Sequence, residues 1–191
     1  MHLILASTSC YRRELVARLG VPFTCHAPDC DEDSFKHLAL APEALAQRLA
    51  KEKAGSVSQR FPKAAVIGSD QLLEVDGMVL GKPGSAERAV EQLLLLSHKT
   101  HRLITAMVLQ VGPKVFEHTD ITELTFRPLT KLQAERYVAT DNPVDCAGSY
   151  KFEAAGIRLV QSMISEDPSA ITGLPLLRLG DWLTLLGFTF P

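Results

Sequence analysis

The sequence lacks several features that would each indicate a particular class of protein. Among its 191 residues, no apolar run approaches the roughly 20 residues that a membrane-spanning helix needs. The first residues carry no basic segment of the kind that opens a signal peptide. Its 20 Lys and Arg are balanced by 22 Asp and Glu, so the basic footprint of a nucleic-acid-binding protein is absent. We expect a small-molecule substrate, with no nucleic acid and no membrane among the partners.

Cysteine is scarce as well. The four cysteines form no C-x-x-C pair, which argues against disulfides and fits a reducing cytoplasm. Cys25, His26 and Cys30 lie close together, but their spacing matches no common zinc site. The G-x-S-x-G nucleophile elbow and the H-E-x-x-H metalloprotease motif are also missing. These absences argue against a covalent serine hydrolase and a zinc protease.

What the sequence does contain is an alternation of strand-like and helix-like segments. The hydrophobic fraction of 46% and the charged fraction of 22% are ordinary for a globular protein. Strands are expected at 3–6, 22–26, 64–75, 78–80, 101–111, 115–126, 145–149 and 156–163. Helices are expected at 11–19, 42–60, 85–97, 130–139 and 174–186. This order favours an α/β fold with a mixed β-sheet in a single domain over 1–191.

A first polar cluster follows the first expected strand. It holds Ser7, Thr8 and Ser9, and two arginines, Arg12 and Arg13, stand in the helix that comes next. A helix N-terminus presents unpaired N–H groups and attracts anions, and guanidiniums can hold phosphate oxygens bidentately. A helix capped by Ser9 with two solvated arginines explains this stretch alone equally well.

A second cluster is "IGSDQ" at 67–71, in which Asp70 interrupts an apolar run. A buried carboxylate is costly unless it is paired or binds a metal. The flanking residues are apolar in both alternating positions, as in a strand buried on both faces. That pattern favours a functional carboxylate over one turned to solvent.

Two further segments carry charges next to glycines. "GKP" at 81–83 is no P-loop, since Walker A needs four residues between its glycines and a Ser or Thr after the lysine. Lys82 could still bring a charge to a phosphate, although a solvated turn lysine explains it as well. In "CAGSYKFEAAGI" at 146–157, Glu153 could accept hydrogen bonds from a guanine edge, or could be an exposed loop charge.

Together these segments resemble the Maf family of nucleoside triphosphate pyrophosphatases. The matching stretches lie at 3–15, 48–54, 67–71, 81–83 and 146–153, in the family's order and approximate spacing. The resemblance implies a mixed sheet with flanking helices, in two lobes around a cleft, as in inosine triphosphatase-like enzymes. It also implies hydrolysis of a nucleoside triphosphate to the monophosphate and pyrophosphate, dependent on a divalent metal (Mg, Mn or Co).

The resemblance also implies roles for individual residues. Asp70 would be the proton acceptor. The phosphate end would be lined by Ser7, Ser9, Arg12, Arg13, Lys53 and Lys82. Asp70 could position or deprotonate the attacking water, hold the metal, or do both. Glu32, in an acidic loop expected at 27–35, is a second expected metal ligand.

Three residues point to one branch of the family. The branch acting on dTTP and UTP carries Asp-Thr where this chain has Asp70-Gln71. The branch resembling 7-methyl-GTP pyrophosphatase carries Asp-Gln, a glutamate matching Glu153 and an aromatic residue before the two arginines, here Tyr11. 7-Methylguanine is cationic, and a cation over an aromatic face gains roughly 0.5–2 kcal/mol. We therefore expect 7-methyl-GTP as substrate and house-cleaning of non-standard nucleotides as the role. Tyr11 stands where tryptophan is usual in this branch, and Cys10 where proline is usual.

Two alternatives remain open at this point. One is a dTTP/UTP pyrophosphatase, and the other is a regulator of cell division and septum formation that binds a nucleotide without turnover. A carboxylate beside a triphosphate argues against a pure binder, because it would repel the ligand's own charge. A homodimer is the family-based expectation for assembly.

Overall fold

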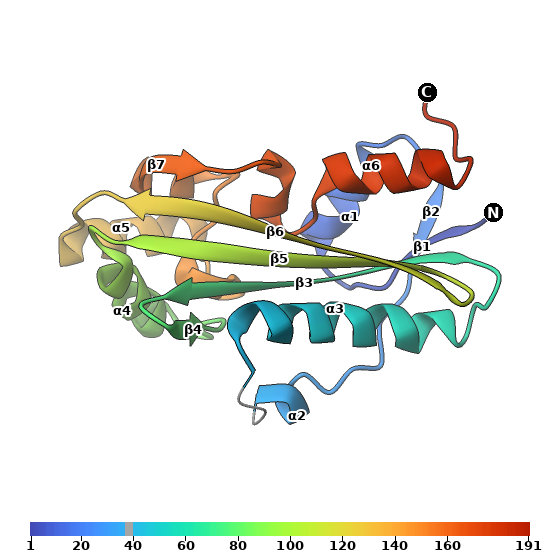
Figure 1. Ribbon diagram of the computed structural model, residues 1–191. Helices are drawn as coiled ribbons and strands as arrows, with labels where there is room; N and C mark the ends of the chain where they lie inside the picture. Colours follow the sequence, from blue (N-terminus) through green and yellow to red (C-terminus); the bar gives the residue numbers. More distant parts are fainter. Residues whose placement is uncertain (37–39) are drawn as a thin grey trace. The chain divides into compact units, whose positions relative to one another are not determined.

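The structure is a computed structural model that describes residues 1–36 and 40–191. In this part of the chain seven strands form one sheet in the order β2-β1-β3-β5-β6-β7, with β4 paired to β3 (Figure 1). β1 runs parallel to β2 and β3, whereas β4 and β7 run antiparallel to their partners. The α/β fold with a mixed sheet that the sequence predicts is confirmed.

The strands and helices have the following bounds. The strands are β1 (Leu3–Leu5), β2 (Phe23–Cys25), β3 (Ala65–Val75), β4 (Met78–Leu80), β5 (Thr100–Val111), β6 (Lys114–Phe126) and β7 (Val160–Ile164). The helices are α1 (Cys10–Ala17), α2 (Asp33–Lys36), α3 (Pro42–Ser58), α4 (Ala86–Leu96), α5 (Lys131–Asp141) and α6 (Leu176–Leu185). Short 3₁₀ helices are η1 (Ala147–Ser149), η2 (Ala155–Leu159) and η3 (Pro168–Thr172). Within 1–36 and 40–191, no helix combines the length and the apolar character needed to cross a membrane.

The chain divides into two compact units. The first unit comprises Met1–Asp70, Thr105–Asp120 and Asp167–Pro191. The second unit comprises Gln71–Ile104 and Ile121–Glu166. The division within β3 falls between Asp70 and Gln71, so the two adjacent residues of the "DQ" pair belong to different units.

The core of the first unit explains why β1 is apolar in every position. Leu3 and Leu5 pack in a cluster with residues of α1 and α6, whereas Ile4 packs with Val57 of α3 and with Val66. In Figure 1, α3 and the α1–α6 pair accordingly cover different faces of the strands. Fully burying one such side chain stabilises the fold by about 1.5–3 kcal/mol.

A close approach between α3 and β3 depends on Gly68. A Cβ atom at this position would lie 2.3 Å from the carbonyl oxygen of Ala50 and 2.6 Å from the backbone nitrogen of Ala54. Both distances are far inside van der Waals contact, so the helix backbone reaches the strand only because residue 68 has no side chain. The contact carries α3 over the part of β3 that ends at Asp70.

Several local predictions are confirmed. Asp76 and Gly77 form the turn between β3 and β4 with φ angles of 51° and 79°, as an Asp-Gly hairpin requires. Thr130 and Gln133 make the predicted capping box of α5, with both reciprocal bonds present. Pro42 stands at the first turn of α3, where its missing N–H costs nothing.

Three predictions from the sequence are wrong in detail. The segment 145–149 is no strand: it contains η1, and Gly148 and Ser149 have φ angles of 75° and 64°, which a strand cannot accommodate. In the expected strand 156–163 the first half is η2, and β7 begins only at Val160. The acidic segment 27–35, expected as a loop, includes the beginning of α2.

Candidate active site

The loop after β1 is organised by its own hydroxyl groups. Ser9 caps α1, and its hydroxyl oxygen accepts from the backbone N–H of Arg12 at 3.4 Å. The backbone N–H of Ser9 donates to Ser7 Oγ at 3.1 Å. The predicted capped helix therefore exists, and the cap leaves other N–H groups of the first turn directed out of the helix end, where an anion is favoured.

A pocket of about 230 Å³ opens at this helix end. Its lining includes Ser7, Ser9 and Arg13, three of the residues expected to hold phosphate, together with the exposed Cys25. Burial raises the pKa of the Cys25 thiol, and the nearby positive charge of Arg13 opposes this shift. Tyr11 lies half-buried in the same first turn of α1.

The central feature of the first unit is an ion-paired group of Lys53, Asp70 and Glu32. Lys53 Nζ lies 2.5 Å from Asp70 Oδ1 and 2.7 Å from Glu32 Oε1. Lys53 and Asp70 are 7% and 6% exposed, whereas the Glu32 side chain is 55% exposed. The two carboxylates compensate the buried positive charge of Lys53. The Lys53 charge in turn compensates the buried negative charge of Asp70.

The protonation of Asp70 is controlled by opposing effects. Burial raises the pKa of Asp70, and the nearby charge of Glu32 raises it further. The charges of Lys53 and Arg12, and the Lys53 hydrogen bond, lower the pKa and oppose this shift. Desolvation is the largest of these effects, so the carboxyl group has a higher proton affinity than an ordinary aspartate. A carboxylate of this kind accepts a proton from water more readily than a solvent-exposed one.

Arg12 is fixed by a residue from the other end of the chain. Its Nε donates to the carbonyl oxygen of Gly173 at 2.9 Å. Burial lowers the pKa of Arg12 while the charges of Asp70 and Glu32 raise it, which places the guanidinium in their electrostatic field. Since Nε is used for this bond, the two terminal nitrogens of the fork are the donors that would hold an anion.

The Gly173 carbonyl oxygen also accepts a hydrogen bond from the Ser69 hydroxyl. The Ser69 hydroxyl lies 2.9 Å from Gly173 O and 2.8 Å from Ala106 O, directly before Asp70 in the sequence. Gly173 has a φ angle of 109°, and a Cβ added there would lie 3.3 Å from Arg12 Nε. A glycine therefore satisfies both the backbone conformation and the space that the arginine occupies.

The turn that presents Gly173 is held by Asp167 and Ser169. Asp167 Oδ1 accepts from the backbone N–H of Ser169 at 2.9 Å, and its Oδ2 accepts from the N–H of Leu177 at 2.7 Å. Ser169 Oγ accepts from Leu176 N–H at 2.8 Å. These bonds fix η3 and the beginning of α6, and with them the carbonyl that positions Arg12.

In the second unit, Gln92 hydrogen-bonds to two of the predicted segments, 81–83 and 146–157. Its Nε2 donates to Gly81 O at 3.1 Å, and its Oε1 accepts from Ser149 Oγ at 2.5 Å. One amide of α4 thus holds both the turn that carries Lys82 and the segment that leads to Glu153. Lys82 and Glu153 are themselves exposed, and Gln71 is half-buried at the start of this unit's part of β3.

The segment around Tyr150 is anchored by two buried aromatic hydroxyls. Tyr150 OH lies 3.0 Å from His101 Nε2, and the backbone N–H of Lys151 donates to Tyr137 OH at 2.8 Å. Burial lowers the pKa of His101 to about 4, so this imidazole is neutral at pH 7 and forms a neutral hydrogen bond. Burial raises the pKa of Tyr150, which keeps its hydroxyl protonated as well.

Several of these residues escape an inspection of the sequence. Gly173, Asp167 and Ser169 lie in "DPSAITGLP", a stretch without charge clusters or a known motif, and Gln92 and His101 stand inside an ordinary helix and strand. The clue in the sequence was a Gly-Leu-Pro that follows a Pro-Ser turn, which predicts a turn but not its partner.

Asp70 and Glu32 fit a divalent cation of the magnesium type. Their oxygens meet at the same Lys53 amine, and Mg²⁺ is commonly held by one or two carboxylates with substrate phosphates and waters as the other ligands. Across the ranges 1–36 and 40–191, no group of three or more His, Cys, Asp or Glu side chains could hold a metal. The ligand chemistry of Asp70 and Glu32 would therefore suit a cation that takes its other ligands from substrate and solvent.

The first unit thus brings together a buried carboxyl group of raised proton affinity, two cations close to it and a helix end lined with hydroxyl groups. The family described as Maf-like protein matches residues 2–186. The chain belongs to this family, as its sequence motifs predict.

Curated relatives match nearly the whole chain. A protein of Bdellovibrio bacteriovorus is 49% identical over 178 residues, which cover 93% of this chain and 93% of that protein. A protein of Xanthomonas axonopodis pv. citri is 48% identical over 190 residues, covering 99% of this chain and 98% of that protein. A third, from Albidiferax ferrireducens, is 44% identical over 178 residues, covering 92% and 88%. All three are named 7-methyl-GTP pyrophosphatase.

Proposed function

We propose that this protein hydrolyses 7-methyl-GTP to 7-methyl-GMP and pyrophosphate. The buried Asp70–Lys53 pair carries the assignment to hydrolysis, because binding alone gives no reason to bury a carboxylate of raised pKa beside a triphosphate. The names of relatives at 44–49% identity support the choice of substrate. The expected cellular role is the removal of a non-standard nucleotide.

In the proposed mechanism, Asp70 accepts the proton of a water molecule. The water oxygen forms a bond to the α-phosphorus, the bond from that phosphorus to the α–β bridging oxygen breaks, and the proton goes to an Asp70 carboxylate oxygen. Arg12, Arg13 and Lys53 hold phosphate oxygens and offset the charge that develops on departing pyrophosphate. Lys82 is the expected cation from the second unit.

A divalent cation fits the oxygen atoms of Asp70 and Glu32. When bound, it supplies Lewis-acid polarisation of a phosphate oxygen. Asp70 has two carboxylate oxygens, so holding a cation with one and accepting a proton with the other are compatible tasks. Lys53 orients the carboxylate for both, since it fixes Oδ1 at 2.5 Å.

For base recognition we propose Tyr11, Gln71 and Glu153. The Tyr11 ring offers a face to a cationic base. Glu153 offers acceptors to the N1–H and the exocyclic amine of a guanine, and Gln71 offers both a donor and an acceptor. Glu153 follows the segment 149–151, which hydrogen-bonds to Gln92, His101 and Tyr137, and this anchoring suits a residue that must select one base edge.

A nucleotide panel tests the substrate. Pyrophosphate release is measured for 7-methyl-GTP, GTP, dTTP and UTP, each with Mg²⁺, Mn²⁺ and Co²⁺. We expect the highest kcat/KM for 7-methyl-GTP and no release after chelation of the metal. Faster turnover of dTTP or UTP would refute the base assignment and leave the reaction class intact. Tight binding of every nucleotide without product would favour the non-catalytic regulator instead.

We further propose that 1–191 acts as one Maf-like domain in the cytoplasm, as a homodimer. All four cysteines are free, which fits a reducing compartment. Sedimentation equilibrium of the purified chain, with and without nucleotide, distinguishes the dimer from a monomer.

A further inference from the structure

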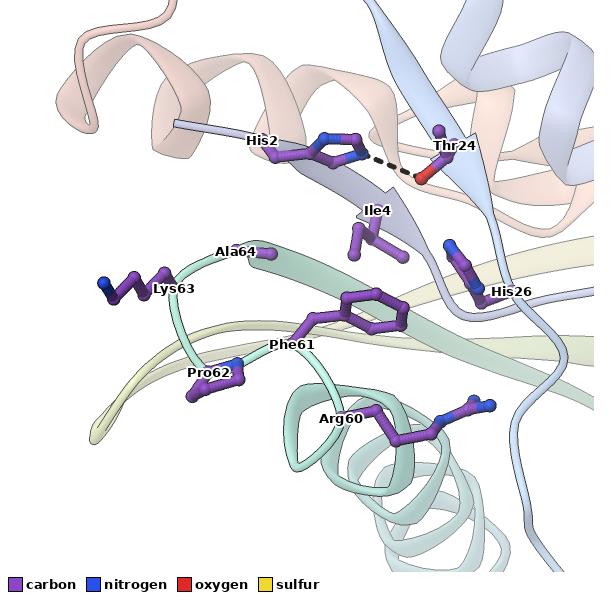
Figure 2. Close-up of a pocket in the computed structure, with 9 residues that line it drawn as sticks. All are labelled: His2, Ile4, Thr24, His26, Arg60, Phe61, Pro62, Lys63 and Ala64. Atoms are coloured by element: carbon purple, nitrogen blue, oxygen red, sulfur yellow. Dashed lines mark hydrogen bonds between the residues drawn. The ribbon is translucent and has the colours of Figure 1, made fainter.

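The first unit has a second, larger pocket, which we call the edge pocket (Figure 2). Its volume is about 560 Å³, within the range of sites for small molecules and cofactors. Its lining comes from β1 and β2 and from the residues Arg60–Ala64 between α3 and β3. None of the phosphate-end residues Ser7, Ser9, Arg12, Arg13 and Lys53 lines it, so the edge pocket is distinct from the candidate active site.

Two aromatic rings form one wall of the edge pocket. The Phe61 and His26 ring centroids lie 4.5 Å apart with planes inclined by 50°. Ile4, which is 2% exposed, and Ala64, which is 5% exposed, form an apolar floor. Figure 2 shows the Phe61 ring below Ile4, with His26 beside it. Rings over an apolar floor accept a flat aromatic group by stacking, and this interaction tolerates many different rings.

The charge of the lining has one sign. Arg60 and Lys63 contribute cations, and the residues that line the pocket include no aspartate or glutamate. Arg60 Nη2 donates to Ala27 O at 2.6 Å, which fixes the guanidinium on the His26 side of the pocket. That bond uses one of the five guanidinium N–H donors. Lys63, by contrast, extends away from the Phe61 ring in Figure 2.

A hydrogen-bonded pair provides polar groups at the opposite side. His2 Nε2 and Thr24 Oγ1 lie 2.8 Å apart and join the residue before β1 to β2. Aromatic faces, one fixed guanidinium and a hydroxyl–imidazole pair together suit a planar ring that bears sugar hydroxyls and an anion.

We propose that the edge pocket is a second binding site, for a nucleoside 5′-monophosphate. The base stacks on the Phe61 ring with the tilted His26 ring at its edge, and the phosphate binds Arg60. Choosing this ligand among aromatic anions rests on the proposed function, since that reaction releases a nucleoside monophosphate. The site's preference for an aromatic anion rests on the lining alone.

Occupancy of the edge pocket has a direct connection to the acidic segment. Arg60 holds Ala27, and the backbone N–H of Asp29 donates to Ser56 Oγ at 3.1 Å, near the end of α3. These bonds anchor the beginning of the stretch that leads to Glu32. A phosphate that draws Arg60 away from Ala27 O would therefore loosen one of the two anchors.

Histidine NMR resonances provide a readout that does not depend on hydrolysis. The full-length protein is labelled at histidine ¹³Cε1, and the signals of His2, His26 and His101 are assigned by single substitutions to Gln. GMP is then added as the probe. We expect saturable shifts of the His2 and His26 signals, while the buried His101 signal of the second unit stays in place. Unmoved His2 and His26 signals at millimolar GMP would overturn the proposal.

Two further titrations identify the ligand class. Inorganic phosphate tests the anion alone, and naphthalene-1-carboxylate tests an aromatic anion without a sugar. Weaker binding of both than of GMP supports a nucleotide site. Equal binding of the naphthalene compound overturns the nucleotide assignment, and equal binding of phosphate overturns the stacking role.

Variants separate the edge pocket from the active site. Phe61→Leu keeps an apolar side chain but removes the π face, and Arg60→Gln removes the charge; each is expected to weaken GMP binding about tenfold. Lys51→Gln, which removes an exposed cation of α3 outside the pocket lining, is the matched control and leaves binding unchanged. Arg12→Gln disables the phosphate end of the active site and leaves the His26 shift intact. Loss of the shift in Arg12→Gln would place GMP at the active site and refute the edge pocket.

The two proposals fail independently. A GMP-induced His26 shift in a protein that hydrolyses no nucleotide would retain the second site and discard the proposed function. Hydrolysis of 7-methyl-GTP without any His2 or His26 shift would do the reverse.

Discussion

The two units fix their candidate site residues by different means. In the first unit, Asp70 and Lys53 are buried charges that neutralise one another, and Arg12 is tied to a carbonyl. In the second unit, Lys82 and Glu153 are exposed, and neutral groups such as Gln92 and Tyr137 hold the backbone that carries them. Buried charge suits chemistry on phosphates, because electrostatic effects are strong where water is excluded. A rigid backbone with exposed side chains suits discrimination between bases.

The largest effect should come from the carboxyl group of the first unit. Asp70→Asn keeps the shape of the side chain and removes the proton acceptor, so we expect kcat to fall by about 10²–10⁴ while the nucleotide still binds. Steady-state pyrophosphate release measures kcat, and a non-hydrolysable triphosphate analogue measures binding. Glu52→Gln, which breaks an exposed ion pair with Arg48 on the same helix, is the control. Near-normal turnover by folded Asp70→Asn would rule out a base role.

The next effect tests whether Arg12 depends on its carbonyl partner. Gly173→Ala places a methyl group 3.3 Å from Arg12 Nε at a φ of 109°, which an alanine adopts only at a cost of about 1–3 kcal/mol. We expect kcat/KM to fall about tenfold or more, with a higher KM for triphosphate.

Gly180→Ala is the matched control for that substitution. Gly180 lies in α6, and a Cβ there meets nothing within 4 Å. This variant should keep full activity and gain about 0.5–1 kcal/mol of stability from the higher helix propensity of alanine. Equal activity losses in both variants would mean that the arginine does not depend on this contact.

A smaller effect is expected in the second unit, from Gln92. Gln92→Leu removes the amide that joins Gly81 O and Ser149 Oγ, so the segments carrying Lys82 and Glu153 should lose their fixed arrangement. We expect the preference for 7-methyl-GTP over dTTP to fall several-fold, with little change in kcat. Competition assays with the two nucleotides measure this ratio. A large loss of kcat with unchanged preference would contradict the division of tasks between the units.

The smallest effect is a displacement of the pH profile. Lys53 lowers and Glu32 raises the pKa of Asp70, and the carboxylate must be deprotonated to act. Lys53→Met should therefore move the acidic limb of kcat/KM to higher pH, and Glu32→Gln should move it to lower pH. The direction of both shifts, measured over pH 4–8 with a fixed metal concentration, tests the model of the charges around Asp70. Shifts of the same sign would refute it.

The order of strands and helices could be predicted from the sequence, but the supports of the site could not. Periodicity and capping residues such as Thr130 act over a few positions, so they are visible locally. The Arg12–Gly173 bond joins residues 161 positions apart through a main-chain carbonyl, which every residue possesses. The residue type at a position therefore does not indicate that its carbonyl oxygen is such an acceptor. The error at 145–149 has a similar cause, because the positive φ of Ser149 is imposed by its surroundings rather than by its own preference.

The absence of a side chain at Gly68 limits how far the backbones that carry Lys53 and Asp70 could move when a substrate binds. Since the backbones of α3 and β3 approach closely at Gly68, the distance between the main-chain positions that carry Lys53 and Asp70 is set by main-chain contacts. In the proposed reaction, charges held at a fixed spacing before the substrate binds would keep the reorganisation energy of the step small. A bulkier residue at 68 would push α3 away from β3. We expect it to slow the proposed reaction although it contacts no reacting group.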